Sequence, residues 1–229
     1  MSSSGILEVD PSWRELHRGA TVGLIAMWGV TNPASNDHLN DLATNLETDL
    51  RSRLGSADRE TIRGTPPLPA YAAYYKRWGQ RYHVAMQLES VAQKGKALPR
   101  VAALVEAMFI AELRNLLLTA GHDLDALQLP VRLYLGAGES FTAANGQETT
   151  VKAGDMAIAD AQGRVLSAII TGPSDVARIG SATTAALFYT YAPAGIDSAL
   201  VAAHLDEIER NVRFISSEMA VAGREIITA

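Results

Sequence analysis

Residues 119–127 read TAGHDLDAL, and they separate two kinds of sequence pattern. From residue 100 onward, apolar side chains recur at steps of three and four, which is typical of a helix buried over much of its surface. From residue 129 onward, apolar and polar residues alternate with a period of two, which predicts strands. Because helical patterns gather before residue 127 and strand patterns after it, the sequence predicts an α+β fold.

TAGHDLDAL itself has two interpretations. Gly121 stands where a left-handed residue would end the preceding helix, and Asp123 and Asp125 suit the turn that follows, Asp125 also as a cap for the short turn ALQL. Alternatively, His122 and the two aspartates form a cluster that shares a proton or binds a divalent ion. We favour the helix end, and expect no bound metal and no cofactor.

Four helices and two strands are predicted on the N-terminal side. The motif GTPPLP at 64–69 excludes regular structure, because proline removes a hydrogen-bond donor and restricts the residue before it, so we expect a turn or a rim loop there. Strands are expected at 6–9 and 21–28, and helices from Asn36 or Asp37 to Gly55, at 70–78, at 83–93 and from Arg100 to about Thr119.

Strands and turns dominate the C-terminal side until a last helix. Asn145-Gly146 is typical of a hairpin turn, and further turns are expected at 154–155 and 160–163. Strands are expected at 131–135, 164–171 and 184–191. A long helix is predicted to begin at 195–198 and to be closed by Gly223, so the fold is expected to pack helices on a mostly antiparallel sheet with a long C-terminal helix.

The bulk composition excludes several classes of protein. The 229 residues contain no cysteine, which excludes disulfides, thiolate zinc sites and cysteine nucleophiles and fits a cytoplasmic location. The N-terminus has no basic region followed by an apolar run, so no secretory signal is expected, and no apolar stretch approaches the ~20 residues of a membrane span. The net charge of −5 argues against a general polyanion binder, because the chain as a whole repels polyanions.

One segment departs from this acidic balance. Residues 76–100 contain six basic residues against only Glu89, a charge of +5, so the rest of the chain sums to −10. Basic residues interleaved with Trp78, Tyr82 and His83 can hold a phosphate backbone and stack on bases, whereas a plain solvated surface is the alternative. The candidate RNA-binding residues are Lys76, Arg77, Arg81, Lys94, Lys96 and Arg100.

The usual catalytic and nucleotide-binding motifs are missing. The sequence has no HExxH motif, no Walker loop and no GxSxG elbow, and the glycines at 136–138 predict a tight turn rather than a dinucleotide site. The stretch TGPSD at 171–175 interrupts two apolar strands with polar residues. Such a loop either lines a pocket or simply forms a wide connection, and the residues leave both interpretations open.

The order of four motifs resembles the B3/B4 domain of the phenylalanyl-tRNA synthetase beta subunit. The resemblance covers about residues 66–222 of a predicted single domain, 1–229, in which 1–65 supply the N-terminal strands and helix. No synthetase core motif follows, so a stand-alone B3/B4-like protein is expected. The motifs are LPRVAALVEAMFIAELRNLLLTAGHDLDAL, VRLYLGAGESF, AGDMAIADAQGRVL and IITGPSDVARIGSATTAALFY.

In the synthetase this domain hydrolyses tyrosine wrongly attached to the tRNA, so the resemblance implies an aminoacyl pocket between a helix and the sheet. Asp123-Leu124-Asp125, Asp155, Asp160, Gly172 and Thr183 or Thr184 match the family pattern. Met108 and Phe109 replace its polar helix pair, Ala120 replaces its histidine, and Tyr189 falls near its tyrosine-reading glutamate. The implied pocket residues are Met108, Phe109, Gly172, Ser174, Arg178, Thr183 and Tyr189, with His122 and Asp175 as catalytic candidates.

Two hypotheses about function follow. In the first, the protein associates with tRNA or aminoacyl-tRNA and hydrolyses a mischarged ester, because an activated ester needs only a positioned water and hydrogen-bond donors. In the second, it is a non-catalytic module that binds a small amino-acid-like ligand without RNA. The replaced pocket residues favour the second hypothesis, because a buried hydroxyl is selected strongly only by a polar partner.

Overall fold

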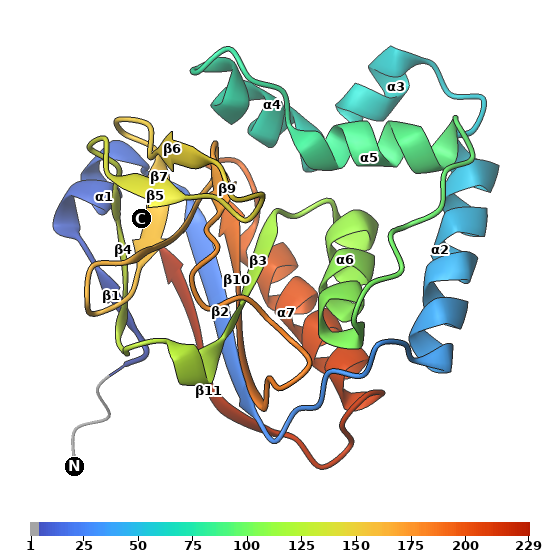
Figure 1. Ribbon diagram of the computed structural model, residues 1–229. Coiled ribbons are helices and arrows are strands. Elements are labelled where there is room, and N and C mark those ends of the chain that lie inside the picture. The colour runs from blue at the N-terminus through green and yellow to red at the C-terminus, as the bar shows by residue number, and fades with distance from the viewer. Residues whose placement is uncertain (1–4) are drawn as a thin grey trace.

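The computed structural model describes residues 5–229, and it confirms the α+β class (Figure 1). The helices are α1 (Pro11–Leu16), α2 (Asp37–Leu54), α3 (Arg59–Gly64), α4 (Leu68–Lys76), α5 (His83–Ala92), α6 (Ala103–Asn115), the 3₁₀ helix η1 (Leu124–Ala126) and α7 (Ser198–Arg213). The strands are β1 (Leu7–Val9), β2 (Thr21–Trp28), β3 (Thr119–Asp123), β4 (Val131–Leu135), β5 (Ser140–Thr142), β6 (Glu148–Thr150), β7 (Met156–Ala159), β8 (Val165–Ala168), β9 (Gly172–Pro173), β10 (Ala185–Ala192) and β11 (Ala220–Thr228).

The strands form two main sheets instead of the one expected. The five-stranded sheet has the order β1-β4-β7-β8-β9, the four-stranded sheet has the order β11-β2-β10-β3, and β5 and β6 form a hairpin. Every strand pair is antiparallel except β1 with β4, which confirms the mostly antiparallel prediction. The strands β3 and β9 are edge strands of their sheets, and the cavity described below lies beside both of them.

Several elements lie where short sequence motifs predict them. The strand β2 occupies 21–28 as predicted. The side chain of Asn36 accepts a hydrogen bond from the Leu39 N–H and begins α2, and that of Asp197 accepts one from the Ala199 N–H and begins α7. The Asn145-Gly146 turn joins β5 to β6, with Gly146 at φ 82°. In each case the signal and the element it predicts lie within a few residues of each other.

The predicted helix end at Gly121 is wrong. The helix α6 ends at Asn115, and Leu116 adopts the left-handed conformation at φ 58°. The residues TAGHD then form β3, which pairs with β10 from Thr119–Thr190 to Asp123–Ala186. Asp123, rather than Asp125, caps η1 by accepting a hydrogen bond from the Asp125 N–H. The central helix is therefore shorter than predicted, and the histidine of this stretch lies on a strand.

Two further boundaries differ from the sequence prediction. The helix α7 ends at Arg213 rather than at Gly223, and residues 220–228 form β11, which pairs along the whole of β2. The stretch 64–69 is only partly irregular, because its ends belong to α3 and α4 and only the residues between them form a connection. Because β11 is defined by its pairing with β2, which is distant in the sequence, the local pattern alone predicts that α7 continues to Gly223.

The helices lie in layers on the four-stranded sheet. Figure 1 shows α6 and α7 against that sheet, α2 outside them and α4 and α5 across one end. Three tyrosines of α4 fix it to both sheets, and Tyr82 at the start of α5 is bonded to the end of α6, because each buried hydroxyl donates to an acceptor beyond its own helix. Tyr71, Tyr74, Tyr75 and Tyr82 donate to the Tyr191 carbonyl, the Asp155 carboxylate, the Ile169 carbonyl and the Leu116 carbonyl.

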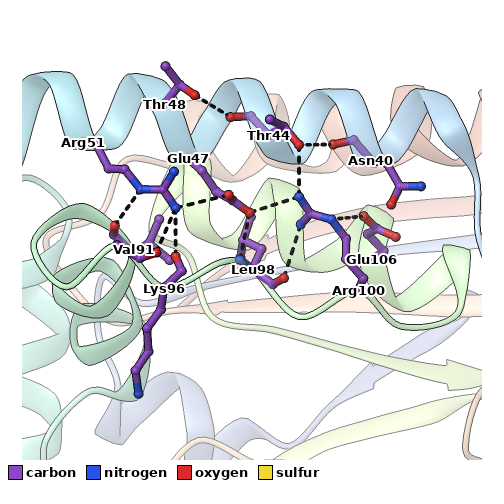
Figure 2. Close-up of polar contacts among 11 residues, drawn as sticks. Asn40, Thr44, Glu47, Thr48, Arg51, Val91, Lys96, Leu98, Arg100 and Glu106 are labelled. Atoms are coloured by element: carbon purple, nitrogen blue, oxygen red, sulfur yellow. Dashed lines mark hydrogen bonds and ion pairs between the residues drawn. The ribbon is translucent and has the colours of Figure 1, made fainter.

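A buried carboxylate holds the segment between α5 and α6 (Figure 2). Glu47 on α2 is 5% exposed, and its Oε1 accepts from the Leu98 N–H at 2.9 Å and from Arg100 at 3.0 Å. Its Oε2 accepts from Arg51 at 3.2 Å, and Arg51 in turn donates to the carbonyl of Lys96 at 3.1 Å. These charge-assisted bonds satisfy backbone groups that the irregular segment leaves unpaired.

Candidate ligand-binding site

A cavity of about 350 Å³ lies between α6, the edge strand β3 and the segment around β8 and β9. This volume lies in the range of small-molecule sites, which are mostly apolar with a few converging polar groups. The structure brings together there six of the nine site residues predicted from the sequence. They are Met108, Phe109, His122, Gly172, Ser174 and Arg178.

One face of α6 forms the helical wall. Val105, Met108, Phe109 and Glu112 lie at helical steps of three and four and all line the cavity. Three of these side chains are apolar, so the wall suits an aliphatic or aromatic group. Glu112 is the exception, because it places a carboxyl group on an otherwise apolar surface.

His122 faces the cavity from β3 and is 1% exposed. Its Nδ1 lies 3.1 Å from the Val176 carbonyl, so Nδ1 carries the proton and Nε2 accepts from the Tyr189 hydroxyl at 2.9 Å. Burial lowers the pKa of His122 to about 4, against the opposing effect of hydrogen bonds to the backbone of Val176 and Ala177. The imidazole is therefore neutral near pH 7, and both ring nitrogens are occupied.

The hydrogen-bond chain continues from His122 into the contact between the two sheets. The Ser167 hydroxyl on β8 lies 2.9 Å from the Tyr189 hydroxyl and 2.8 Å from the Tyr191 hydroxyl, both on β10. Ser167 and Tyr191 line the cavity, whereas Tyr189 is fully buried. The chain fixes the side chains at the base of the cavity, because each member already has a partner.

Glu112 is 3% exposed and lines the cavity. Its Oε2 accepts a hydrogen bond from the Thr119 N–H at 2.8 Å, and among the described residues no donor lies within hydrogen-bond distance of Oε1. Burial raises the pKa of Glu112 to about 8, although the Thr119 N–H opposes that shift. Sequence reasoning missed this residue, because a charged side chain within an apolar helical stripe is expected to point to solvent.

The segment after β9 forms the opposite wall. Gly172 has φ 79°, a conformation that favours glycine, and the buried Ser174 bridges to Ala143 of the β5–β6 hairpin. Ala177 has φ 54°, and its carbonyl accepts from the Asp123 N–H at 2.8 Å, which ties the segment to β3. Arg178 is exposed at the rim, and no carboxylate of residues 5–229 forms an ion pair with it.

The other three predicted site residues do not line the cavity. Thr183 donates to the Asp123 carboxylate at 2.7 Å and accepts from the Gly180 N–H, so it holds the end of β3. Tyr189 lies behind His122 in the hydrogen-bond chain. Asp175 is exposed, and only its backbone N–H is bonded, to the Thr142 carbonyl.

The six predicted RNA-binding residues lie near both ends of α5. Arg100 forms ion pairs with Glu47 and Glu106 (Figure 2). Lys94 and Lys96 follow the C-terminus of α5, which at ten residues is about 15 Å long. Lys76, Arg77 and Arg81 precede its N-terminus, where His83 lines the cavity, and the Arg77 guanidinium lies over the rings of Tyr74 and Trp78.

Between residues 5 and 229, no three histidine, aspartate or glutamate side chains lie together in a way that could hold a metal ion. No helix in that range is both long and apolar enough to cross a membrane.

Solved structures similar to this chain include one that matches nearly its whole length. The chain resembles the crystal structure of an N-terminal fragment of the phenylalanyl-tRNA synthetase beta subunit from Pyrococcus horikoshii, at 12% sequence identity and a TM-score of 0.48. The similarity covers 98% of this chain and 50% of that one. Similarity at this level carries no argument about activity, ligands or partners. No protein-family model matches the sequence, and no curated protein matches it.

Proposed function

We propose that the cavity binds the aminoacyl end of a charged tRNA and that the protein acts in the cytoplasm on such esters. The observation that carries this proposal is the convergence of six residues, predicted from separate motifs resembling the B3/B4 domain, on one mostly apolar cavity. A cavity of ~150 Å³ holds a benzene-sized molecule, so about 350 Å³ accommodates an amino-acid side chain with its acyl group.

Cations near the cavity rim support an RNA partner. Arg178 lies at the rim, and Arg81 stands two residues before His83, which also lines the cavity. Lys76 and Arg77 end α4 a few residues earlier. Arg77 and Arg81 line two other hollows, so a phosphate backbone would pass over the end of α4 and the N-terminus of α5 to meet these cations, while the acyl group enters the cavity beside Arg178.

Ester hydrolysis at this site would depend on a positioned water rather than on His122. Both ring nitrogens of His122 are engaged and burial keeps the ring neutral, so the imidazole is poorly placed to exchange a proton with a ligand. Asp175 lies outside the cavity. The hydroxyl of Ser174 and the guanidinium of Arg178 are the polar groups that remain on the wall facing α6.

The experiment compares charged and uncharged tRNA in a filter-binding assay over a salt series. We expect wild-type affinity to fall steeply with salt, and the Lys76→Ala/Arg77→Ala/Arg81→Ala variant to lose about two to three units of the log–log slope, since each phosphate contact contributes about 0.7–0.9. The matched control is Lys94→Ala/Lys96→Ala, which removes cations from the far end of α5 and should leave the slope nearly unchanged. Absence of binding at low salt would reject the RNA partner.

The acyl group is tested separately from the phosphates. Ala144 lines the cavity and is only partly buried, so Ala144→Trp should block entry without disturbing the core. We expect this variant to bind charged and uncharged tRNA equally, whereas wild type prefers the charged form. Ala137→Trp, at an exposed turn outside the cavity, is the control. Release of amino acid from mischarged tRNA, measured against buffer alone, reports hydrolysis.

A second candidate function is binding of a free amino-acid-like ligand without RNA. The observation that favours it is the dispersal of the predicted basic surface, in which Arg100 is paired with acidic residues and the two lysines lie at the far end of α5. The filter-binding assay distinguishes the two functions. If this second function holds, tRNA is not retained, and a free amino acid binds wild type but not Ala144→Trp.

A further inference from the structure

Glu112 is the only carboxylate among the residues that line the cavity. It is 97% removed from solvent, and a single backbone N–H, that of Thr119, hydrogen-bonds to it. Oε1 has no hydrogen-bond partner among the described residues and is not sealed inside the core, so it is open to a ligand in the cavity. A ligand that offers a donor to Oε1 would give it a hydrogen-bond partner.

The surroundings of Glu112 favour a cationic donor at the end of an aliphatic chain. The walls beside it are apolar and come from Val105, Met108 and Leu118. Within the residues described, no lysine or arginine forms an ion pair with Glu112, so no cation of the chain neutralises it. The lysine side chain has the matching chemistry, an apolar four-carbon stem that ends in an ammonium group.

The strand β3 runs from the acidic end of the cavity to its basic end. Thr119, whose N–H holds Glu112, is at its beginning, and Asp123, whose N–H binds the Ala177 carbonyl next to Arg178, is at its end. Their backbone positions are four residue steps apart, or about 13 Å. A ligand lying along β3 would therefore have its amine and its acyl or carboxylate group separated by several bonds, with the acyl end near the rim.

We propose that Glu112 is the ammonium-binding residue of this cavity, so that the preferred ligand is an amino acid or aminoacyl ester whose side chain ends in a primary amine. The inference rests on the proposed binding of an aminoacyl group in the same cavity. In the complex the ammonium group donates to Oε1 of Glu112, and the carboxylate or ester lies beside Arg178.

The test is calorimetric binding of three free amino acids to the full-length protein. L-lysine is compared with L-norleucine, which has the same aliphatic chain without the amine, and with L-tyrosine, which ends in a neutral hydroxyl. We expect wild type to bind lysine about 10- to 100-fold more tightly than norleucine, the usual effect of a charge-assisted hydrogen bond. Glu112→Gln should bind lysine and norleucine with affinities within about threefold of each other.

The outcomes separate this inference from the function on which it rests. If lysine and norleucine bind wild type equally, or tyrosine binds more tightly than lysine, Glu112 is not an ammonium site although the cavity still binds amino acids. If none of the three binds and charged tRNA is also not retained, the proposed function fails with it. The wild-type comparison needs no variant, so it decides the matter even if Glu112→Gln does not fold.

Discussion

His122 and Glu112 line the same cavity, but their hydrogen-bond partners suit them to different roles. Each nitrogen of His122 has a partner within the protein, and burial keeps the ring neutral. Glu112 has one oxygen without a partner, and burial raises its pKa into the physiological range. The histidine therefore supports the geometry of the cavity, and the glutamate is the group available to a ligand.

The stability of the protein is expected to depend on pH through Glu112. Burial raises its folded-state pKa from 4.5 to about 8, so the folded state binds this proton more tightly than the unfolded state. The resulting stabilisation is present in full below about pH 4.5 and is lost as the pH rises through about 8. Relative to wild type, Glu112→Gln should gain about 2–4 kcal/mol in free energy of unfolding between pH 4.5 and 8, because each pKa unit is worth about 1.4 kcal/mol.

Urea denaturation at intervals from pH 4.5 to 8.5 measures this difference. Glu60→Gln, which changes an exposed glutamate on α3, is the control and should follow wild type at every pH. A constant difference between wild type and Glu112→Gln across the range would show that Glu112 is already ionised at low pH, in contradiction to a raised pKa.

The two residues also differ in how far the sequence could predict them. His122 was conspicuous because it stands beside two aspartates, yet its role depends on Val176 and Tyr189, which lie 54 and 67 residues away. Glu112 was overlooked because it lies within an apolar helical stripe, where a charged residue is expected to point to solvent. Partners distant in sequence decide what a polar residue does, and spacing along one helix does not reveal them.

At the scale of elements, helix starts were predicted well and the ends of α6 and α7 poorly. A start such as that of α2 is specified locally, because the Asn36 side chain bonds to an N–H three residues ahead. The helix α6 ends at Leu116, whose backbone adopts the left-handed conformation. Leucine rarely adopts it, so the residue type does not predict this helix end. The strands β3 and β11 were missed for a related reason, because they are defined by pairing with β10 and β2.

The packing of α7 on the four-stranded sheet depends on Gly23 of β2. A Cβ atom at this position would lie 2.5 Å from Cγ1 of Val201 and 3.1 Å from Cδ1 of Leu205, both fully buried on α7. We expect Gly23→Ala to force the helix away from the strand and to lower the free energy of unfolding by about 1–3 kcal/mol, the usual effect of overpacking. Chemical denaturation monitored by circular dichroism measures the loss.

The same substitution has a control and a rescue. Gly64→Ala, at the end of α3, would place a Cβ with no atom within 4 Å and should change stability by less than about 0.5 kcal/mol. In the double variant Gly23→Ala/Val201→Ala the closest contact is gone, so the two losses should be less than additive. Full additivity would mean that α7 does not press on Gly23.

At the scale of the whole molecule, β11 contacts elements that are far apart in the sequence, namely β2, α7 and the start of β1. It pairs with β2 from Ala220–Trp28 to Thr228–Thr21, and β2 is buried apart from its last residue. Arg224 reaches α7 through the Asp206 carboxylate and the Ala202 carbonyl, and the Glu225 carboxylate accepts from the N–H groups of Ile6 and Leu7, next to β1. The strand thus contacts the helical layer and connects the two sheets.

Removal of residues 220–229 is therefore expected to abolish cooperative unfolding of the whole chain. The truncated protein would expose the inner edge of β2, a row of unpaired backbone groups on an apolar strand, and such an edge promotes aggregation. We expect no single calorimetric transition and a rise in light scattering on heating.

Glu225→Ala in the full-length chain is the matched comparison, because it breaks only the link to β1 while β11 stays paired with β2. It should keep one transition, with a loss of about 1–3 kcal/mol for the two N–H groups left without their acceptor. If the truncated protein unfolded in one transition at the wild-type temperature, the four-stranded sheet would not need its edge strand, and the core between α7 and β2 would fold without it.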